Sequence, residues 1–127
     1  MQGKQLFEYA VIRVVPRVER EEFMNVGVIL FCASRKYLDS VFEIEDERLL
    51  SFCKTADIEA IRENVNSLKL ICQGGVTAGP IGRLDPASRF RWLTATRSTV
   101  VQCSKVHPGF CIDPEEMLLQ LQQEMVL

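Results

Sequence analysis

Alternation of apolar and polar residues marks three strands in the first third of the chain. Residues 7–15 are rich in β-branched and aromatic side chains and stop at Pro16, which is typical of a strand. Residues 24–32 are almost continuously apolar, which indicates a central strand buried on both faces. Residues 38–45 alternate, with mostly polar side chains on one face. Because the links between these strands are short, we expect an antiparallel meander.

Helical spacing follows this strand region. The firmest helix is predicted over residues 57–72, where apolar side chains recur at helical intervals at Ile58, Ile61, Val65 and Leu68. Shorter helices are expected over residues 47–54 and 85–92. A last helix opens at Asp113-Pro114, where an N-cap residue precedes a proline.

These elements predict one α+β domain that spans residues 1–127. A fourth strand is expected over residues 99–103, after the glycine-rich loop and the short helix. We therefore expect an antiparallel sheet of about four or five strands that begins with the three-stranded meander. The helices are expected to pack on one face of this sheet.

Composition narrows the class of protein. The 127 residues suit one domain, and 47% hydrophobic with 25% charged residues excludes disordered and fibrous chains. No apolar run approaches the roughly 20 residues of a membrane span, and no apolar leader follows Met1. Five cysteines without a Cys-x-x-Cys pair favour a reducing compartment, so we expect a cytoplasmic protein without disulfides.

Charge is distributed unevenly along the chain. The net charge of -2 makes nucleic acid an unfavourable partner. Residues 83–107, however, hold five basic side chains against Asp85, whereas residues 37–60 hold seven acidic and two basic ones. The basic segment combines arginine forks with hydroxyl groups, a combination that suits a phosphate or carboxylate ligand. These residues are Arg91, Arg97, Ser98 and Thr99. Alternatively, the basic segment pairs with the acidic one inside the domain.

Two polar residues interrupt apolar strands and need polar partners. Arg13 lies in the first predicted strand and Asn25 in the second. For Arg13 we expect a carboxylate, such as that of Glu22 or Glu43. We expect both residues to join His107, the only histidine, and residues 97–99 in one polar cluster. The cluster is either an internal network that fixes strand order or the floor of a ligand pocket, and both alternatives stay open.

Catalytic and metal chemistry have weak support in the sequence. Cys103, His107 and Cys111 are spaced four apart, but Pro108 prevents the helix that would align them, and a fourth ligand is not evident. We therefore predict no metal site and no cofactor. An enzyme would need Arg91 and Arg97 to hold a phosphate-bearing substrate, with His107 as acid or base. Because no nucleophile or cofactor loop accompanies them, we predict no catalytic residue and favour binding over catalysis.

Two blocks of the sequence resemble a known family. The first runs Tyr9-Ala-Val-Ile-Arg13-Val-Val-Pro16 and continues through residues 22–31. The second covers residues 90–102, followed by Val106-His107-Pro-Gly109 and Asp113-Pro114. Both are similar to the bacterial family called domain of unknown function 3037. The resemblance implies a small cytosolic bacterial protein with no assigned reaction and a HipA-like kinase as a candidate partner, and it assigns no catalytic residue.

The sequence thus predicts a small binding or accessory module. We expect it to recognise a protein partner or an anionic ligand, and we expect no membrane association. The candidate ligand-binding residues are Arg13, Asn25, Arg91, Arg97, Ser98, Thr99 and His107. The alternatives are an enzyme that acts on a phosphate-bearing substrate and a weak nucleic-acid binder.

Overall fold

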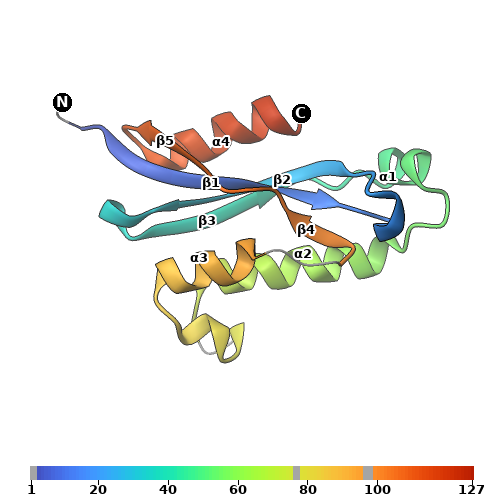
Figure 1. Ribbon diagram of the computed structural model, residues 1–127, viewed down its shortest axis with the longest axis horizontal. Helices are drawn as coiled ribbons and strands as arrows, with labels where there is room; N and C mark the ends of the chain where they lie inside the picture. The colour runs from blue at the N-terminus through green and yellow to red at the C-terminus, as the bar shows by residue number, and fades with distance from the viewer. Residues whose placement is uncertain (1–2, 76–77, 96–98) are drawn as a thin grey trace.

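The central element of the fold is β1 (Gln5–Val14), a strand that is paired along both edges. The computed structural model describes residues 3–75, 78–95 and 99–127 (Figure 1). On one edge β1 pairs antiparallel with β2 (Met24–Cys32), which pairs with β3 (Tyr37–Phe42). On the other edge β1 pairs with β4 (Val101–Cys103) and β5 (His107–Cys111). Within the described residues the sheet therefore has five strands, and the predicted meander and α+β class are confirmed.

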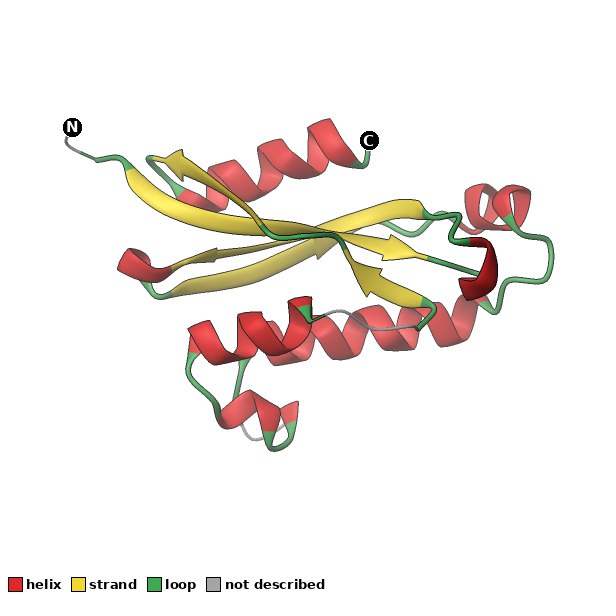
Figure 2. Cartoon of the chain, viewed as in Figure 1, coloured by secondary structure: helices red, strands yellow, loops and turns green. Residues whose placement is uncertain are grey.

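Helices cover both faces of this sheet (Figure 2). On one face lie α2 (Ile58–Gln73) and α3 (Pro86–Thr94), and on the other lies α4 (Pro114–Met125). The short α1 (Asp46–Phe52) lies beyond the end of the sheet (Figure 1). Short 3-10 turns lie in the connections between these elements: η1 (Val18–Arg20), η2 (Ala33–Arg35) and η4 (Ile81–Arg83). In the described part of the chain, no helix is long and apolar enough to cross a membrane.

The expectation that all helices pack on one face is wrong, because the sheet has two apolar faces. Ala10, Ile12 and Val14 of β1 join the core under α2 and α3. Phe7 of the same strand joins a second core under α4, together with residues of β2 and of α4 itself. Each apolar face must be removed from water, so each needs its own helical layer.

The predicted helix starts are confirmed. Asp57, Asp85 and Asp113 each accept a hydrogen bond from a backbone N–H in the first turn of the helix that follows. Proline occupies the first turn of both α3 and α4, where its missing N–H leaves no hydrogen bond unmade.

A bulge in β2 lies opposite the end of β1. The pairing of Ile12 with Gly27 and of Arg13 with Asn25 leaves Val26 as an extra residue. Gly27 is required here because β3 approaches closely: a Cβ at this position would lie 2.4 Å from the Val41 carbonyl oxygen.

The strands β4 and β5 pair with the same edge of β1, one after the other, with a one-residue irregularity between them. Ile12 pairs with Cys103 and Tyr9 with His107, so β1 advances three residues while its partner advances four. Ser104 lies at the irregularity, where its Oγ accepts a hydrogen bond from the Val11 N–H at 2.8 Å. The strand β5 was not predicted, because Pro108 and Gly109 suggest a turn when taken without their long-range pairing to β1.

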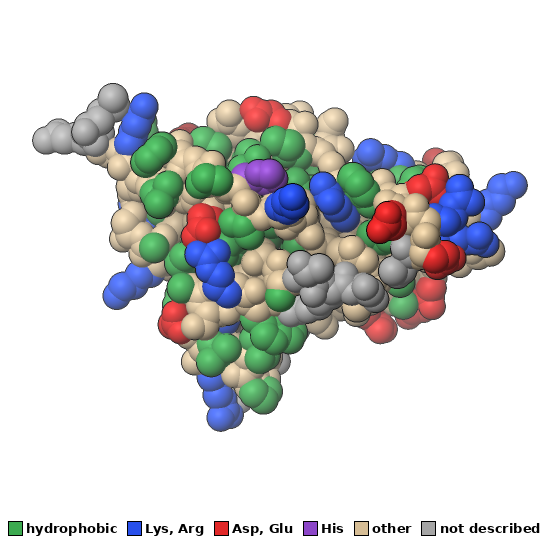
Figure 3. Space-filling model, in the orientation of Figure 1, with side chains coloured by type: hydrophobic (Ala, Val, Ile, Leu, Met, Phe, Trp, Pro, Cys, Tyr) green, Lys and Arg blue, Asp and Glu red, His purple; other side chains and the backbone are tan. Residues whose placement is uncertain are grey.

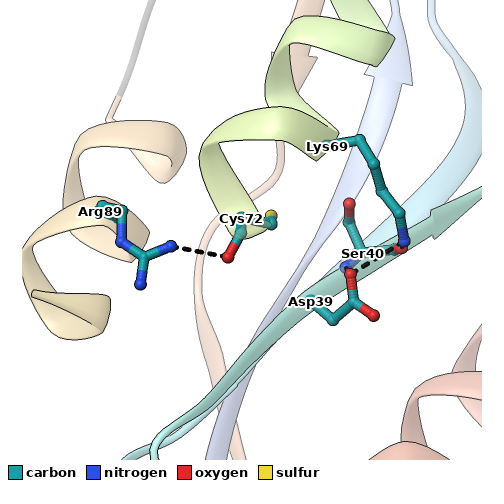
Figure 4. A network of polar contacts seen from close by, with 5 residues as sticks. All are labelled: Asp39, Ser40, Lys69, Cys72 and Arg89. Carbon is teal, nitrogen blue, oxygen red and sulfur yellow. Dashed lines mark hydrogen bonds and ion pairs between the residues drawn. The ribbon is translucent and has the colours of Figure 1, made fainter. Parts of the chain in front are cut away.

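The C-terminal end of α2 is held by a buried arginine. Arg89 of α3 donates from Nη1 to the carbonyl oxygens of Ile71 and Cys72, at 2.8 and 2.7 Å, and from Nε to that of Leu84, at 2.9 Å. Figure 4 shows the guanidinium directed at the last turn of α2. One side chain thereby satisfies carbonyl groups that a helix end leaves without partners, and it ties α2 to α3.

Replacement of Arg89 by methionine should destabilise the fold strongly. The substitution keeps an apolar stem but leaves the three carbonyl oxygens without their donor, so we expect a loss of about 3 kcal/mol in the free energy of unfolding. Urea denaturation measures this loss. Arg83→Met, at an exposed arginine nearby in the chain, is the control and should change stability by less than about 0.5 kcal/mol. Equal midpoints for the two variants would contradict the assigned role of Arg89.

Candidate functional site

A hollow of about 400 Å³ lies at the end of the sheet where β1 terminates. One wall is the connection from β1 to β2, which contains η1, and the other is the end of α1 with the turn that follows it. We call this hollow the basic groove. It is lined by Pro16, Arg17, Arg20, Glu22, Phe52, Cys53, Lys54 and Thr55.

Local backbone geometry sets both walls of the basic groove. On one side Pro16 ends the strand region, and Glu21, with a φ of 58°, turns the chain back toward β2. On the other side Cys53 ends α1, with its N–H donating to the Leu49 carbonyl oxygen at 2.8 Å. The chain then turns immediately, because the Ala56 N–H donates to the Cys53 carbonyl oxygen at 3.1 Å. Short turns on both sides bring two segments that are distant in sequence to the same hollow.

Positive charge exceeds negative charge in the basic groove. Its lining includes three cationic side chains, Arg17, Arg20 and Lys54, and one carboxylate, Glu22. Glu22 is already paired, since its Oε1 lies 2.6 Å from Nε of Arg20. Within the described residues neither Arg17 nor Lys54 forms an ion pair. Figure 3 shows basic side chains gathered at this end of the molecule, with acidic ones among them.

A thiol lies among these cations. Sγ of Cys53 is 3.5 Å from Oγ1 of Thr55. Hydrogen bonds from Thr55, first from its side chain and then from its backbone, lower the pKa of the Cys53 thiol, and the positive charge of Arg17 lowers it further. By contrast, burial raises the pKa of the Cys72 thiol to about 12. All five cysteines are free thiols in the structure.

Arg91, which the sequence marks as an anion clamp, is already bound to a carboxylate. Its two terminal nitrogens donate to the two carboxylate oxygens of Glu8 on β1, at 2.9 and 2.7 Å. The Glu8 carboxylate accordingly raises the pKa of Arg91. The acidic stretch 37–60 has different partners, which lie on α2. Asp39 forms an ion pair with Lys69, as Figure 4 shows, and Asp46 forms one with Arg62. Among the described residues, the proposed internal pairing of segments 83–107 and 37–60 is therefore not made.

Arg13 has an aromatic partner instead of the expected carboxylate. Its guanidinium carbon lies 3.9 Å from the centre of the Phe23 ring, and it forms no ion pair within the described part of the chain. A cation over an aromatic face is attracted by the ring quadrupole, so the expected pairing with Glu22 or Glu43 is wrong. Asn25, its cross-strand neighbour, donates from Nδ2 to the Met125 carbonyl oxygen at the end of α4, at 3.1 Å.

The remaining predicted site residues do not form one cluster with these. His107 is exposed, and its ring lies 5.4 Å from that of Tyr9, centre to centre, on the face of the sheet that α4 covers. Arg91 lies with α3 on the opposite face. Thr99 donates to the Val101 carbonyl oxygen at 2.6 Å. Arg97 and Ser98 lie outside the described residues.

The four-residue spacing of Cys103 and His107 does not place them on the same face of the sheet. In a regular strand this spacing would place both side chains on one face. The extra residue between β4 and β5 changes the alternation, so Cys103 follows Ile12 on one face and His107 follows Tyr9 on the other. Among the residues that the structure describes, no group of three potential metal ligands is found.

Comparison with known proteins identifies the family. The family model described as "Protein of unknown function (DUF3037)" matches residues 9–126. The chain belongs to this family. No curated protein and no solved structure matches it. The DUF3037 match includes the whole basic groove, so the groove lies within the family's domain and not in an appended segment.

The basic groove of this DUF3037 chain was missed by sequence reasoning. Arg17 and Arg20 stand in a polar connection, and Lys54 stands in a segment whose charge is dominated by acids. No sequence pattern links the two segments, because their proximity depends on the position of α1 beyond the end of the sheet. The one available signal was the pair of arginines directly after Pro16, at the end of a predicted strand.

The Cys53 thiol should react first when the native protein is treated with iodoacetamide near neutral pH. Its pKa is lowered while that of Cys72 is raised, so Cys53 holds the larger thiolate fraction. Mass spectrometry of peptides at increasing times measures the order of labelling. Thr55→Val, which removes the hydroxyl, should slow the reaction of Cys53, whereas Thr55→Ser should not. Earlier labelling of Cys103 would contradict the prediction.

Proposed function

We propose that this DUF3037 chain is a binding module that recognises a phosphate- or carboxylate-bearing ligand in the basic groove. The observation that carries the proposal is the pair of cations, Arg17 and Lys54, that line one hollow without an ion-pair partner among the described residues. Arginine offers a planar fork that matches two oxygens of a phosphate, and lysine adds a compact charge. When the protonated Cys53 thiol donates to Thr55 Oγ1, the Thr55 hydroxyl in the same lining has its own hydrogen to donate to the anion.

The exposure of these groups sets the expected strength of binding. Arg17, Lys54 and Thr55 are all exposed, so water and salt screen the attraction to an anion. We expect affinities for simple anions that are roughly micromolar to millimolar and fall with ionic strength. We therefore propose the basic groove, in place of the segment 83–107, as the anion site.

The enzyme alternative has less support. It requires Arg91 and His107 to act on one substrate, but they lie on opposite faces of the sheet, and Arg91 is bound to Glu8. Among the residues that line the basic groove there is no histidine that could transfer a proton near pH 7. A protein partner, which the sequence also predicts, would use the groove only by presenting an anionic group there.

Removal of both unpaired cations should weaken anion binding about tenfold or more. We would titrate the wild-type protein and the double variant Arg17→Gln, Lys54→Gln with inorganic phosphate and follow backbone NMR shifts. The control Arg83→Gln removes an exposed cation from η4, at the far end of α2, and should leave the affinity unchanged. Raising the ionic strength from about 0.01 to about 0.15 M should weaken wild-type binding, because the screening length falls from about 30 to about 8 Å.

The proposal is wrong if the double variant binds phosphate as tightly as the wild type, or if phosphate shifts no resonance of the groove. Melting temperatures of all variants should agree closely, because the replaced side chains are exposed and hold no other element in place.

A further inference from the structure

A second hollow adjoins the basic groove. It has a volume of about 220 Å³ and shares Pro16, Cys53 and Thr55 with the groove. We call it the apolar hollow. Its remaining lining comes from the first turn of α2, the residues around it and the start of the β4 segment: Ala56, Asp57, Ala60, Ile61, Asn64 and Val100.

The lining of the apolar hollow differs in character from that of the groove. Its side chains are mostly small or aliphatic, and the two alanines create space where larger residues would fill it. Among the described residues, the only charged group in its lining is Asp57, whose Oδ1 accepts the Ala60 N–H at 3.0 Å as the cap of α2. That carboxylate disfavours an anion in the apolar hollow, whereas Arg17 and Lys54 of the adjoining basic groove attract one.

We infer that the two hollows together accept one ligand, an organic anion that carries a compact apolar group. The inference rests on the proposed function, since the phosphate or carboxylate would lie in the basic groove. The apolar group would pack against Ala60 and Ile61. A cavity of about 150 Å³ is known to hold benzene, so a hollow of about 220 Å³ can receive a six-membered ring.

This arrangement predicts a preference that inorganic anions lack. Transfer of a ring from water into the apolar hollow adds a favourable contribution that inorganic phosphate cannot make. Phenyl phosphate should therefore bind the wild-type protein about tenfold more tightly than inorganic phosphate. Benzoate should show the same use of the hollow with a carboxylate in place of the phosphate.

The test separates the hollow from the groove by one substitution. Ala60→Leu fills the space on the α2 side with a good helix former. It should remove the advantage of phenyl phosphate while leaving the affinity for inorganic phosphate unchanged. The matched control is Asn66→Leu, which places the same side chain on an exposed position of α2 away from both hollows and should change neither affinity.

A direct measurement on the wild-type protein makes the test independent of variant stability. With methyl-labelled alanine and isoleucine, phenyl phosphate should shift the Ala60 and Ile61 signals, whereas inorganic phosphate should not. If phosphate binds but phenyl phosphate gains nothing and leaves both methyl signals in place, the inference is overturned and the proposed function stands. If neither compound binds, both are overturned.

Discussion

β1 is hydrogen-bonded along both edges and apolar on both faces, and this double burial determines where the other elements lie. Its alternation sends Ala10, Ile12 and Val14 to one core and Phe7 to the other, so the strand needs a helical layer on each side. One edge of β1 pairs with β2, the next strand in the sequence. The other edge pairs with β4 and β5, which follow α3 near the end of the chain. The fit is tight at the far edge, where a Cβ on Gly109 would lie 2.7 Å from Cζ of Phe7.

The position of the basic groove follows from where β1 ends. Val15 still donates to the Val100 carbonyl oxygen, at 2.6 Å, but Pro16 has no N–H to continue this pairing, and the chain turns into η1. α1 lies past the same end of the sheet, and although its Leu49 joins the core under α2 and α3, its last turn meets the connection through η1 in the basic groove. The basic side chains Arg17, Arg20 and Lys54 are exposed there, and like charges in contact with water stand together without a large loss of stability.

Local patterns predicted the elements of the fold well and their spatial assembly less well. The strand predicted over residues 38–45 and the helix starts near Asp57, Asp85 and Asp113 rest on local features. The structure confirms the helix starts, and it confirms the strand as far as Phe42. The face of the sheet on which α4 packs cannot be predicted from the apolar residues of α4, because both faces of the sheet are apolar. β5 was missed for a related reason, because pairing with β1 overrides the turn tendency of Pro108-Gly109.

The candidate site was harder to predict from the sequence than the fold, because the partner of a charged side chain depends on which residues lie near it in three dimensions. Arg91 looks free in the sequence, yet it is bound to Glu8, which lies far from it along the chain. Arg89 caps a helix end, and Arg13 lies over Phe23. Of the basic side chains in the segment 83–107, Arg91 is thus neutralised by a carboxylate, and the donors of Arg89 are engaged by backbone carbonyl oxygens.

For anion binding in the basic groove, the lack of ion-pair partners for two of its cations among the described residues therefore matters more than the number of its cations. Arg62 and Lys69 on α2 form ion pairs with acidic residues of the stretch 37–60. Arg17 and Lys54, by contrast, line the same hollow, and neither has an ion-pair partner among the described residues. Two like charges in a shared hollow repel, although in an exposed site the repulsion is small. An anion placed between them adds two attractions, which together outweigh that repulsion. This change in sign favours the bound state, and its size depends on how far the ligand excludes water from the groove.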